Sequence, residues 1–552
     1  MIRRSHYVLL FVLLGLVYLA GMFVTLFEND SAQFAVMAMR MVQENDFVNL
    51  FKGPEEYLDK PHMHYWLAAL SYLLFGINDW AYRIPTLMAT ALGVYSCYGL
   101  GKVLYQKEVG RLAALVFLSS QTILLAGIDV RTDALLTGFT AFAIWQLARF
   151  VEERKLVSLV LGALGAGLAF STKGQIALLV IALPLLCHLG YSRRWKVLLD
   201  WRILLALGVF VLVISPMLYA YYQQFDLHPE KVIRGRSDRS GILFIFWEQS
   251  FERLSGEGVG KNSSDYFFFF HTFLWVFLPW TVVGIAAFWN KGKQLLRDRA
   301  NPSQGTEALT LGGILLIFII ISFAQFKLPH YLNITIPLFA VLSAAYLHQI
   351  YNQDNKKAAS VLTGVQYFIL GVVFLLSLIL CLVVFRLQPG YLSFVVFLTA
   401  ACIATLVLRK KGRYAKIVLL GTMASIVLNA VLNLHFYPSL LEYQGGSAMA
   451  GIVAEKGIAA DKIYKISERH SWALDFYNRI PVKITTLREL DKMQDIWLYA
   501  SDAEMQELRK KGIIWEQEYT VDQFRITRLQ ARFLNPATRG EILESMHLIY
   551  LP

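Results

Sequence analysis

Charged residues are scarce in this chain of 552 residues, because Asp, Glu, Lys and Arg make up only 17% of it while hydrophobic residues make up 56%. A soluble protein of this length needs far more polar surface, so the composition excludes that class and indicates a protein that crosses a membrane many times. Cysteine is also rare: the four cysteines lie inside apolar runs, and none forms a Cys-x-x-Cys pair. The sequence therefore indicates no disulfide framework, and we predict that the cysteines are small core residues.

Acidic residues are fewer than basic ones, 40 against 52, which gives a net charge of +12. Such an excess can indicate nucleic-acid binding. In this chain the basic residues lie in short loops between apolar runs, where membrane topology accounts for them. We therefore expect no nucleic-acid partner, and we place the loops rich in Lys and Arg in the cytoplasm.

A small-residue cleavage site is missing after the first apolar run, which begins behind Arg3 and Arg4. We therefore predict that this run is a retained span and not a removed signal peptide. With about 20 apolar residues in each span, the sequence predicts about thirteen spans, at 7–27, 84–104, 112–128, 133–150, 156–172, 174–190, 203–222, 267–289, 308–326, 331–350, 359–386, 390–408 and 415–436.

This pattern predicts an α-helical polytopic membrane domain at 1–436 and a small periplasmic α/β domain at 437–552. The N-terminus is predicted to be cytoplasmic, and the two large loops at 28–83 and 223–266 are predicted to be periplasmic. Residues 437–552 alternate between short helical and strand patterns, and they contain neither a phosphate-binding glycine loop nor a catalytic set of residues. A docking or substrate-guiding role is therefore expected for them. The predicted helices are 447–457, 472–478 and 502–510, and the predicted strands are 463–467, 482–485, 496–500, 513–519 and 524–527.

The loop at 28–83 is predicted to carry two amphipathic helices at the membrane interface. After Asp30, the residues Phe34, Met37 and Met41 recur at helical spacing and form one apolar face. Pro61 can begin a second helix at its first position. Such helices lie in the plane of the interface and do not cross the bilayer.

Ionisable residues lie at the periplasmic ends of several predicted spans. For any one of them, anchoring of a helix end is an equally good explanation, but several such turns together favour a common site, because ionisable groups at membrane depth are costly and usually mark a substrate path. Aspartates among Lys and Arg suit a phosphate-bearing substrate, since cations bind the anion and a carboxylate acts as a base or orients the acceptor. These residues are Asp30, Asp129, Arg131, Asp133, Lys173 and Lys327.

Seven short motifs follow one another along residues 1–445. They are Asp30-Ser31, Lys60-Pro61-His62-Met63-His64-Tyr65-Trp66, Arg131-Thr132-Asp133, Thr172-Lys173-Gly174, Glu248-Gln249-Ser250-Phe251-Glu252-Arg253, Leu278-Pro279-Trp280 and Lys327-Leu328-Pro329-His330-Tyr331. In their order, the chain resembles the GT-C glycosyltransferases that use polyprenyl-phosphate sugars. Within that superfamily it resembles the bacterial lipid A aminoarabinose transferases and the protein O-mannosyltransferase superfamily. It departs from the family at Ser31, where a second carboxylate is usual.

The resemblance implies an inverting transfer of a sugar from an undecaprenyl-phosphate carrier to an acceptor outside the bacterial inner membrane, most simply lipid A or a related envelope glycan. It implies that Asp30 and Asp133 are the catalytic acidic residues, and that Lys60, Lys327 and Tyr331 face the donor phosphate. The other substrate-binding residues that we predict are Asp59, Arg83, Arg131, Lys173 and Arg253. Related enzymes sometimes hold a divalent cation, but His62 and His64 match no ligand position of the family, so metal dependence stays open.

Two other functions stay open at this point. Within the same superfamily, the acceptor could be a protein Ser or Thr. From a different class, a lipid or ion transporter would also have many spans with charges among them, although such proteins usually place their charges near the midplane. We expect a monomer that is surrounded by membrane lipids.

Overall fold

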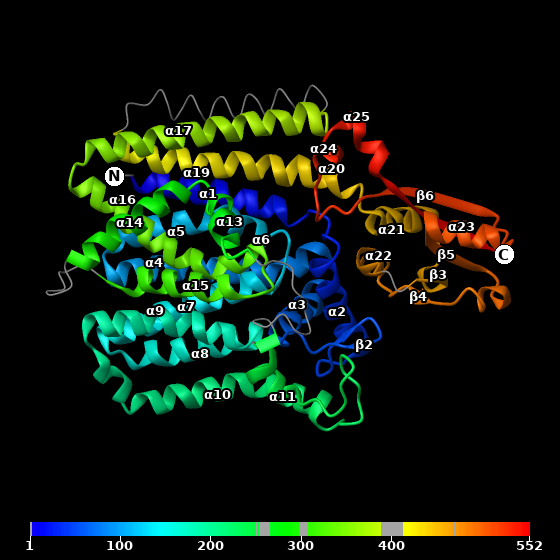
Figure 1. The fold of residues 1–552 in the computed structure, drawn as a ribbon, viewed down its shortest axis with the longest axis horizontal. Helices are drawn as coiled ribbons and strands as arrows, with labels where there is room; N and C mark the ends of the chain where they lie inside the picture. The colour runs from blue at the N-terminus through cyan, green and yellow to red at the C-terminus, as the bar shows by residue number, and fades with distance from the viewer. Residues whose placement is uncertain (1–2, 250, 253–264, 298–306, 388–411, 468–469) are drawn as a thin grey trace.

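The computed structural model of the chain describes residues 3–249, 251–252, 265–297, 307–387, 412–467 and 470–552. Most of these residues are in helices that run side by side in one bundle, and a small α/β unit stands at one end of it (Figure 1). The N-terminus lies at the other end of the bundle (Figure 1). The predicted class, a helical membrane protein with a C-terminal α/β part, is therefore confirmed.

Long apolar helices form the bundle. Among the described residues, nine helices are long and apolar enough to cross a membrane. A tenth span results if the pair α13–α14, which is bent by 120°, counts as one. The bundle consists of α1 (Arg4–Gly21), α4 (Asp79–Leu104), α5 (Lys107–Leu118), α6 (Gln121–Ala126), α7 (Thr132–Glu153), α8 (Leu156–Lys173), α9 (Gln175–Ser192), α10 (Arg202–Tyr221), α13 (Phe268–Val276), α14 (Thr281–Arg297), α15 (Leu309–Phe323), α16 (Ile336–Asn352), α17 (Lys356–Ile379) and α19 (Arg413–Val431).

Two of the predicted spans are interrupted. The span predicted at 112–128 breaks between α5 and α6, where the hydroxyls of Ser119 and Ser120 donate to the carbonyls of Leu115 and Val116, each at 2.6 Å. Such bonds compete with the helical hydrogen bonds of the backbone. The span predicted at 267–289 is the bent pair α13–α14, because Pro279 cannot donate the hydrogen bond that would continue the helix. The span predicted at 390–408 lies outside the described residues.

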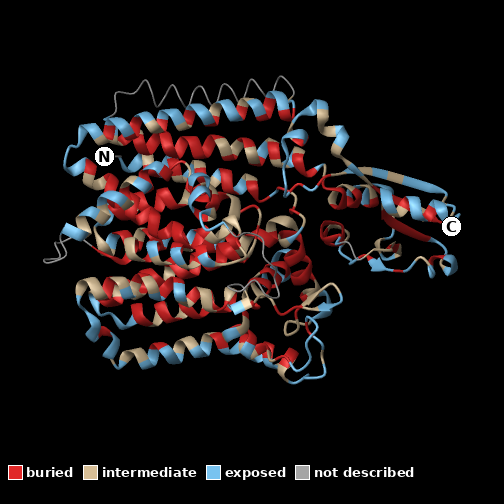
Figure 2. Cartoon of the chain, viewed as in Figure 1, coloured by how far each residue is buried: buried red, intermediate tan, exposed pale blue. Residues whose placement is uncertain are grey.

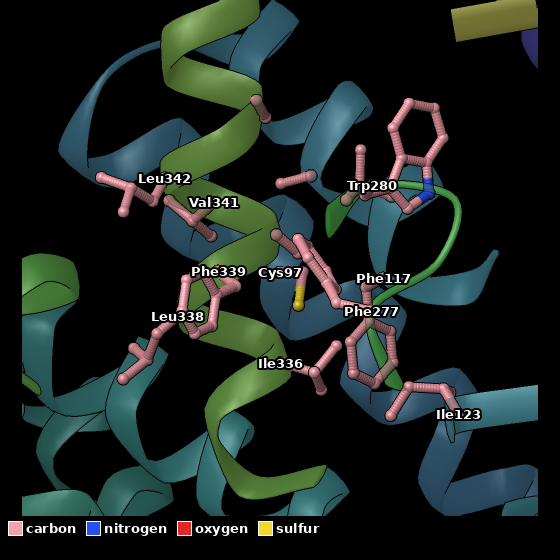
Figure 3. Close-up of a cluster of buried hydrophobic side chains, with 14 of the residues drawn as sticks. Cys97, Phe117, Ile123, Phe277, Trp280, Ile336, Leu338, Phe339, Val341 and Leu342 are labelled. Atoms are coloured by element: carbon pink, nitrogen blue, oxygen red, sulfur yellow. The ribbon is translucent and has the colours of Figure 1, made fainter. Parts of the chain in front are cut away.

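Helix α16 lies at the centre of the core, and its residues from Ile336 to Leu347 are all buried. Figure 3 shows Phe277 and Trp280, from the bend between α13 and α14, among the side chains that gather beside α16. The indole nitrogen of Trp280 donates to the hydroxyl of Ser119 at 2.9 Å, so the polar atom of this buried ring is satisfied. Helices at the edge of the bundle, such as α10 and α17, expose much of their surface (Figure 2). An exposed apolar surface of this kind is the one that meets lipid.

The first large loop forms the two predicted helices, α2 (Asp30–Glu44) and α3 (Met63–Phe75), with a short hairpin of β1 (Phe51–Lys52) and β2 (Glu55–Glu56) between them. Helix α2 is buried from Ser31 to Met39, and it packs against α3 and against α22 (Trp472–Asn478) of the C-terminal unit. The apolar face that we predicted to lie at the lipid interface therefore packs against protein. Tertiary contacts have covered the face that the spacing alone assigned to lipid.

The C-terminal unit is a five-stranded mixed sheet in the order β4-β3-β5-β7-β6. Strand β3 is parallel to β4 and β5, whereas β7 is antiparallel to β5 and β6. The strand predicted at 524–527 is wrong, and strand β7 was not predicted. The elements are α20 (Tyr437–Leu441), α21 (Gly445–Lys456), β3 (Ile463–Lys465), α22, β4 (Lys483–Ile484), β5 (Ile496–Ser501), α23 (Asp502–Lys510), β6 (Gln517–Gln523), α24 (Ala531–Leu534), α25 (Pro536–Arg539) and β7 (Glu544–Leu551).

Candidate active site

A polar cavity of about 240 Å³ lies where the first loop meets the bundle. It is lined by the first turn of α2, by the loop before α3, by the ends of α7 and α8 and by the turn η4 (Pro329–Thr335) before α16. Seven of the ten predicted site residues line it, which are Asp30, Asp59, Lys60, Arg131, Asp133, Lys173 and Tyr331. Residues that are far apart in the sequence thus meet at one end of the bundle, as we predicted.

Asp133 and Lys173 form the most deeply buried ion pair of the cavity. The Lys173 ammonium donates to Asp133 Oδ1 at 2.5 Å, and the two side chains are 11% and 4% exposed respectively. On the other oxygen, His330 Nε2 lies 3.5 Å from Asp133 Oδ2. The ammonium of Lys173 also lies over the ring of Tyr331, 4.6 Å from its centroid. Asp133 is in the first turn of α7 and Lys173 is the last residue of α8, so this buried pair joins two helix ends.

Asp30 and Arg131 form a second ion pair at the same cavity. Arg131 Nη1 donates to Asp30 Oδ2 at 2.6 Å, and Arg131 Nη2 lies 3.1 Å from Asp129 Oδ2. Burial alone would lower the pKa of Arg131, but the carboxylates of Asp129 and Asp30 raise it above its ordinary value. Asp30 remains 41% exposed, so its second oxygen is available to a molecule in the cavity.

Asp59 and Lys60 are held by the second large loop. Arg234 forms an ion pair with Asp59, and it also contacts Glu252 at 2.9 Å. The side-chain amide of Gln249 donates to the backbone carbonyl of Asp59 at 2.6 Å. The loop therefore fixes the backbone from which Lys60 reaches the cavity.

A second, mostly apolar cavity of about 130 Å³ adjoins the first. The two cavities share Lys60, Asp133, Lys173, Phe326 and Tyr331. The remaining lining of the second cavity is largely aliphatic, with residues such as Leu136, Ile176, Leu179, Ile320 and Ile321. An apolar cavity therefore ends at the same cations as a polar one.

Two of the predicted site residues that the structure describes, Arg83 and Lys327, do not line either cavity. Arg83 is buried and donates to the backbone carbonyls of Met22 (2.9 Å) and Ile128 (3.1 Å), so it fastens α4 to neighbouring loops. The ammonium of Lys327 donates to the carbonyl of Asp265 at 2.7 Å. Its neighbours, Phe326 and Leu328, line the polar cavity, whereas Lys327 does not. Arg253 lies outside the described residues.

The lining residues that were not predicted include the polar side chains of Gln33, Lys52, Gln249 and His330. His330 is part of the Lys327–Tyr331 motif, and its position directly before Tyr331 was the one signal that could have identified it. Lys52 is in the hairpin of the first loop, and Gln33 is one helical turn after Asp30. Neither of these two has a distinctive sequence signal.

No group of three or more His, Cys, Asp or Glu side chains that could hold a metal ion occurs in the described ranges. The two carboxylates at the centre of the polar cavity already face Arg131 and Lys173. His62 contacts the carbonyl of Val48 at 2.8 Å, and burial lowers its pKa to about 4. In the described ranges, the carboxylates Asp30 and Asp133 are therefore paired with basic side chains and form no cluster of metal ligands.

Comparisons with known proteins show to which proteins the chain is similar. Residues 59–219 match the model of the dolichyl-phosphate-mannose-protein mannosyltransferase family. The undecaprenyl phosphate-alpha-4-amino-4-deoxy-L-arabinose arabinosyl transferase of Pseudomonas paraeruginosa is 28% identical over 64% of this chain and 62% of its own length. The transferase of the same name from Edwardsiella ictaluri is 25% identical over 63% of this chain and 60% of its own length. The alignments thus cover less than two thirds of either relative.

The fold matches that of a solved structure along nearly the whole chain. ArnT from Cupriavidus metallidurans bound to undecaprenyl phosphate has a TM-score of 0.73, with 17% identity, 99% of this chain covered and 98% of ArnT covered. ArnT in the apo state gives the same TM-score and covers 98% of each chain. The chain therefore has the fold of ArnT, and it resembles the GT-C glycosyltransferases, among them the aminoarabinose transferases.

Proposed function

We propose that the chain is an inverting glycosyltransferase that moves a sugar from an undecaprenyl-phosphate carrier to lipid A or a related envelope glycan. Aminoarabinose is the sugar that we propose, because the two relatives described above are named for its transfer. The observation that carries the proposal is the junction of the apolar and polar cavities at Lys60, Asp133, Lys173 and Tyr331. An undecaprenyl-phosphate sugar has an apolar tail, an anionic phosphate and a polar sugar in that order. The apolar cavity, the lysines at the junction and the polar cavity follow one another in the same order.

The cations at the junction would bind the carrier phosphate. Lys60 and Lys173 both line the two cavities, and Asp133 holds Lys173 at 2.5 Å. During transfer, the bond between the anomeric carbon and a phosphate oxygen breaks, and its electron pair stays on the phosphate. Fixed positive charge beside that oxygen stabilises the charge that develops there.

Asp30 would act on the acceptor. An acceptor hydroxyl forms the new bond to the anomeric carbon and gives its proton to the Asp30 carboxylate. If the acceptor group is itself a phosphate, it needs no base, and Asp30 only orients it. Arg131 holds one oxygen of Asp30 at 2.6 Å, which leaves the other oxygen to face the polar cavity.

The proposed membrane orientation has the N-terminus in the cytoplasm and the C-terminal unit in the periplasm. It is supported by the position of the N-terminus and of this unit at opposite ends of the bundle (Figure 1). The polar cavity is lined by the first turn of α2 and by the loop before α3, and both helices lie at the same end of the bundle as the C-terminal unit (Figure 1). In the proposed orientation this end is periplasmic.

The transporter alternative is less well supported by the position of the charges. Asp133 and Lys173 lie at the ends of α7 and α8, and Asp30 begins α2, so these charges gather at one end of the bundle. Transporters typically place their coupling sites near the midplane, on broken helices of repeated halves. A protein O-glycosyltransferase would use the same donor chemistry with a different acceptor. The experiment below distinguishes a protein acceptor from lipid A.

The test is mass analysis of lipid A and of glycoproteins from cells with and without this protein. We expect a sugar-modified lipid A that depends on the protein; modification of glycoproteins alone would replace the proposed acceptor by a protein. With the purified chain, undecaprenyl-phosphate aminoarabinose and lipid A, Asp30→Asn should lower the turnover number by about 100-fold or more, with an unchanged elution volume in detergent. Asp522→Asn, which changes an exposed aspartate of β6, is the matched control. Wild-type turnover in Asp30→Asn would exclude the assigned role.

A further inference from the structure

The segment Leu26–Asn29, which we call the pre-α2 segment, connects α1 to the helix that begins with Asp30. The C-terminal unit bonds to this segment at several points, although more than 400 residues separate the partners in the sequence. These contacts do not contribute to the lining of the polar cavity. They lie directly next to the residue to which we assign the acceptor chemistry.

Gln444, in the turn between α20 and α21, both accepts a hydrogen bond from the backbone of the pre-α2 segment and donates one to it. Its side-chain oxygen accepts from the amide of Glu28 at 2.7 Å, and its side-chain nitrogen donates to the carbonyl of Leu26 at 2.9 Å. Gln444 is only 2% exposed. A buried side-chain amide that is satisfied by two backbone groups of one segment fixes the position of that segment.

Helix α22 provides two further contacts to the same segment. The hydroxyl of Tyr477 accepts from the amide of Leu26 at 2.9 Å and donates to Asp79 Oδ1, in the first turn of α4, at 2.8 Å. The amide of Ala473 donates to the carboxylate of Glu28, 3.1 Å from Oε2 and 3.3 Å from Oε1. A backbone amide at a helix start favours such a carboxylate.

Asn29 has a backbone conformation that non-glycine residues rarely adopt, with φ 63° and ψ −128°. Its side chain donates to the hydroxyl of Thr527, in the C-terminal unit, at 3.2 Å. A residue in such a region persists only where the surroundings determine its conformation, and residues of this kind gather at functional sites. Asn29 directly precedes Asp30, so its dihedral angles set the direction in which α2 and Asp30 begin.

From these contacts we propose that the C-terminal unit positions Asp30 for the transfer reaction, with Gln444 and Glu28 as positioning residues. The inference rests on the proposed function, because it gives the C-terminal unit a role in that reaction. Loss of the contacts lets the pre-α2 segment relax and moves the Asp30 carboxylate relative to the acceptor. The donor-binding cations come from the loop before α3 and from α8, so donor binding does not depend on these contacts.

A further cavity, of about 380 Å³, is lined in part by Glu28. Its charged lining consists of Glu28 and Glu504 together with Lys465, His470 and Arg525. Burial and, to a smaller extent, nearby Asp475 raise the pKa of Glu28, while the amide of Ala473 and the charge of Lys465 lower it, and the net result is a pKa of about 7. The Glu28 contact with α22 thus changes its charge near neutral pH.

The first experiment compares Gln444→Leu with Gln506→Leu, which changes an exposed glutamine of α23 in the same unit. We expect Gln444→Leu to lower kcat by about 10-fold or more, because a displacement of about 1 Å at a reacting group can lower a rate by about 100-fold and loss of one anchor gives a smaller displacement. The KM for the donor and the Kd for undecaprenyl phosphate should stay unchanged. Wild-type kcat in Gln444→Leu would overturn the inference, and so would a parallel loss of kcat and donor affinity, which indicates general unfolding.

The second experiment measures the pH profile of kcat for Glu28→Gln. The neutral amide oxygen still accepts from Ala473 but does not titrate, so we expect the component with a midpoint near pH 7 to disappear from the profile. A profile identical to that of the wild type would remove Glu28 from the positioning residues. A purely structural role would lower the Tm without moving this midpoint.

Hydrogen exchange separates failure of this inference from failure of the proposed function. In Gln444→Leu without any substrate, the amides of Leu26 and Glu28 should exchange faster than in the wild type, and Gln506→Leu should leave them unchanged. Unchanged protection of these amides would show that Gln444 does not hold the pre-α2 segment, which would overturn the inference. If the wild type transfers no sugar but the amides lose protection, the contacts hold and the proposed function fails.

Discussion

The buried pair of Asp133 and Lys173 allows one prediction to be developed quantitatively. The two charged atoms are 2.5 Å apart, and the side chains are 4% and 11% exposed, so solvent screens their interaction only weakly. Removing one partner of such a pair typically costs about 3–5 kcal/mol, because the other charge is left buried without compensation. In Lys173→Met, Asp133 keeps His330 at 3.5 Å, so we expect a loss of unfolding free energy near the lower limit, about 3 kcal/mol.

The double variant Asp133→Leu with Lys173→Met distinguishes this explanation from a loss of packing. It leaves no unpaired charge from the pair, and apolar replacement of a buried pair is often neutral or stabilising. We therefore expect the double variant to lie within about 1 kcal/mol of the wild type, although each single change destabilises the protein. Both single variants should also lose transferase activity, because Asp133→Leu no longer holds Lys173 beside the donor and Lys173→Met removes that cation.

Unfolding by SDS in mixed micelles measures these free energies. Arg149→Met is the control, since Arg149 and Glu153 form an exposed pair on α7 at 3.0 Å, and such pairs contribute about 0.5 kcal/mol or less. If the losses of the two single variants simply add in the double variant, the argument from an unpaired buried charge is refuted. A loss in Lys173→Met no larger than that in Arg149→Met would refute it as well.

Three further predictions concern donor binding, helix packing and pH. Lys60→Glu should weaken the binding of undecaprenyl phosphate by about 10-fold or more, because an anion replaces a phosphate-binding cation. Titration of the protein with undecaprenyl phosphate measures this change, and unchanged binding would remove Lys60 from the phosphate site. Gly138→Ala should destabilise the bundle by about 1–3 kcal/mol, because its Cβ would meet the Ala89 carbonyl of α4. Gly208→Ala, which lies inside α10 with nothing near its added Cβ, should not destabilise the protein in the same SDS assay and should gain up to about 1 kcal/mol from the higher helix propensity of alanine. Burial raises the pKa of Asp475 to about 6, so the native state holds this proton more firmly than the unfolded chain does. The stability of the protein should therefore fall as the pH rises through about 6. Asp475→Asn should remove this fall from the profile of Tm against pH.

The sequence predicts the elements best where a local signal marks them. Residues 472–478 and 502–510 were predicted as helices, and the structure has α22 and α23 with the same bounds. Ser501 and Glu504 form a capping box at the start of α23, which is a signal within four residues. The strand predicted at 524–527 is wrong because the amide of Phe524 donates at 2.8 Å to the carbonyl of Tyr443, so a tertiary contact replaces the strand pairing.

The site could be predicted in part for a similar reason. Asp30, Asp133 and Lys173 lie at the ends of helices, and their topology alone places them at one face of the membrane. Topology does not determine the direction of a single side chain in an irregular segment. Lys327 and His330 belong to the same motif, yet Lys327 contacts the carbonyl of Asp265 and His330 faces Asp133.

The contacts that orient the site are beyond prediction from periodicity or composition. Asp30 is held by Arg131, 101 residues away, and the backbone of Asp59 is held by Gln249, 190 residues away. Glu28 is held by Gln444, 416 residues away. Each is a single polar side chain that bonds to one group in an irregular segment, so no repeating pattern marks it. Since a displacement of about 1 Å at a reacting group can change a rate by about 100-fold, the residues that differ in activity among chains of this fold should include such distant partners as well as the residues that line the cavity.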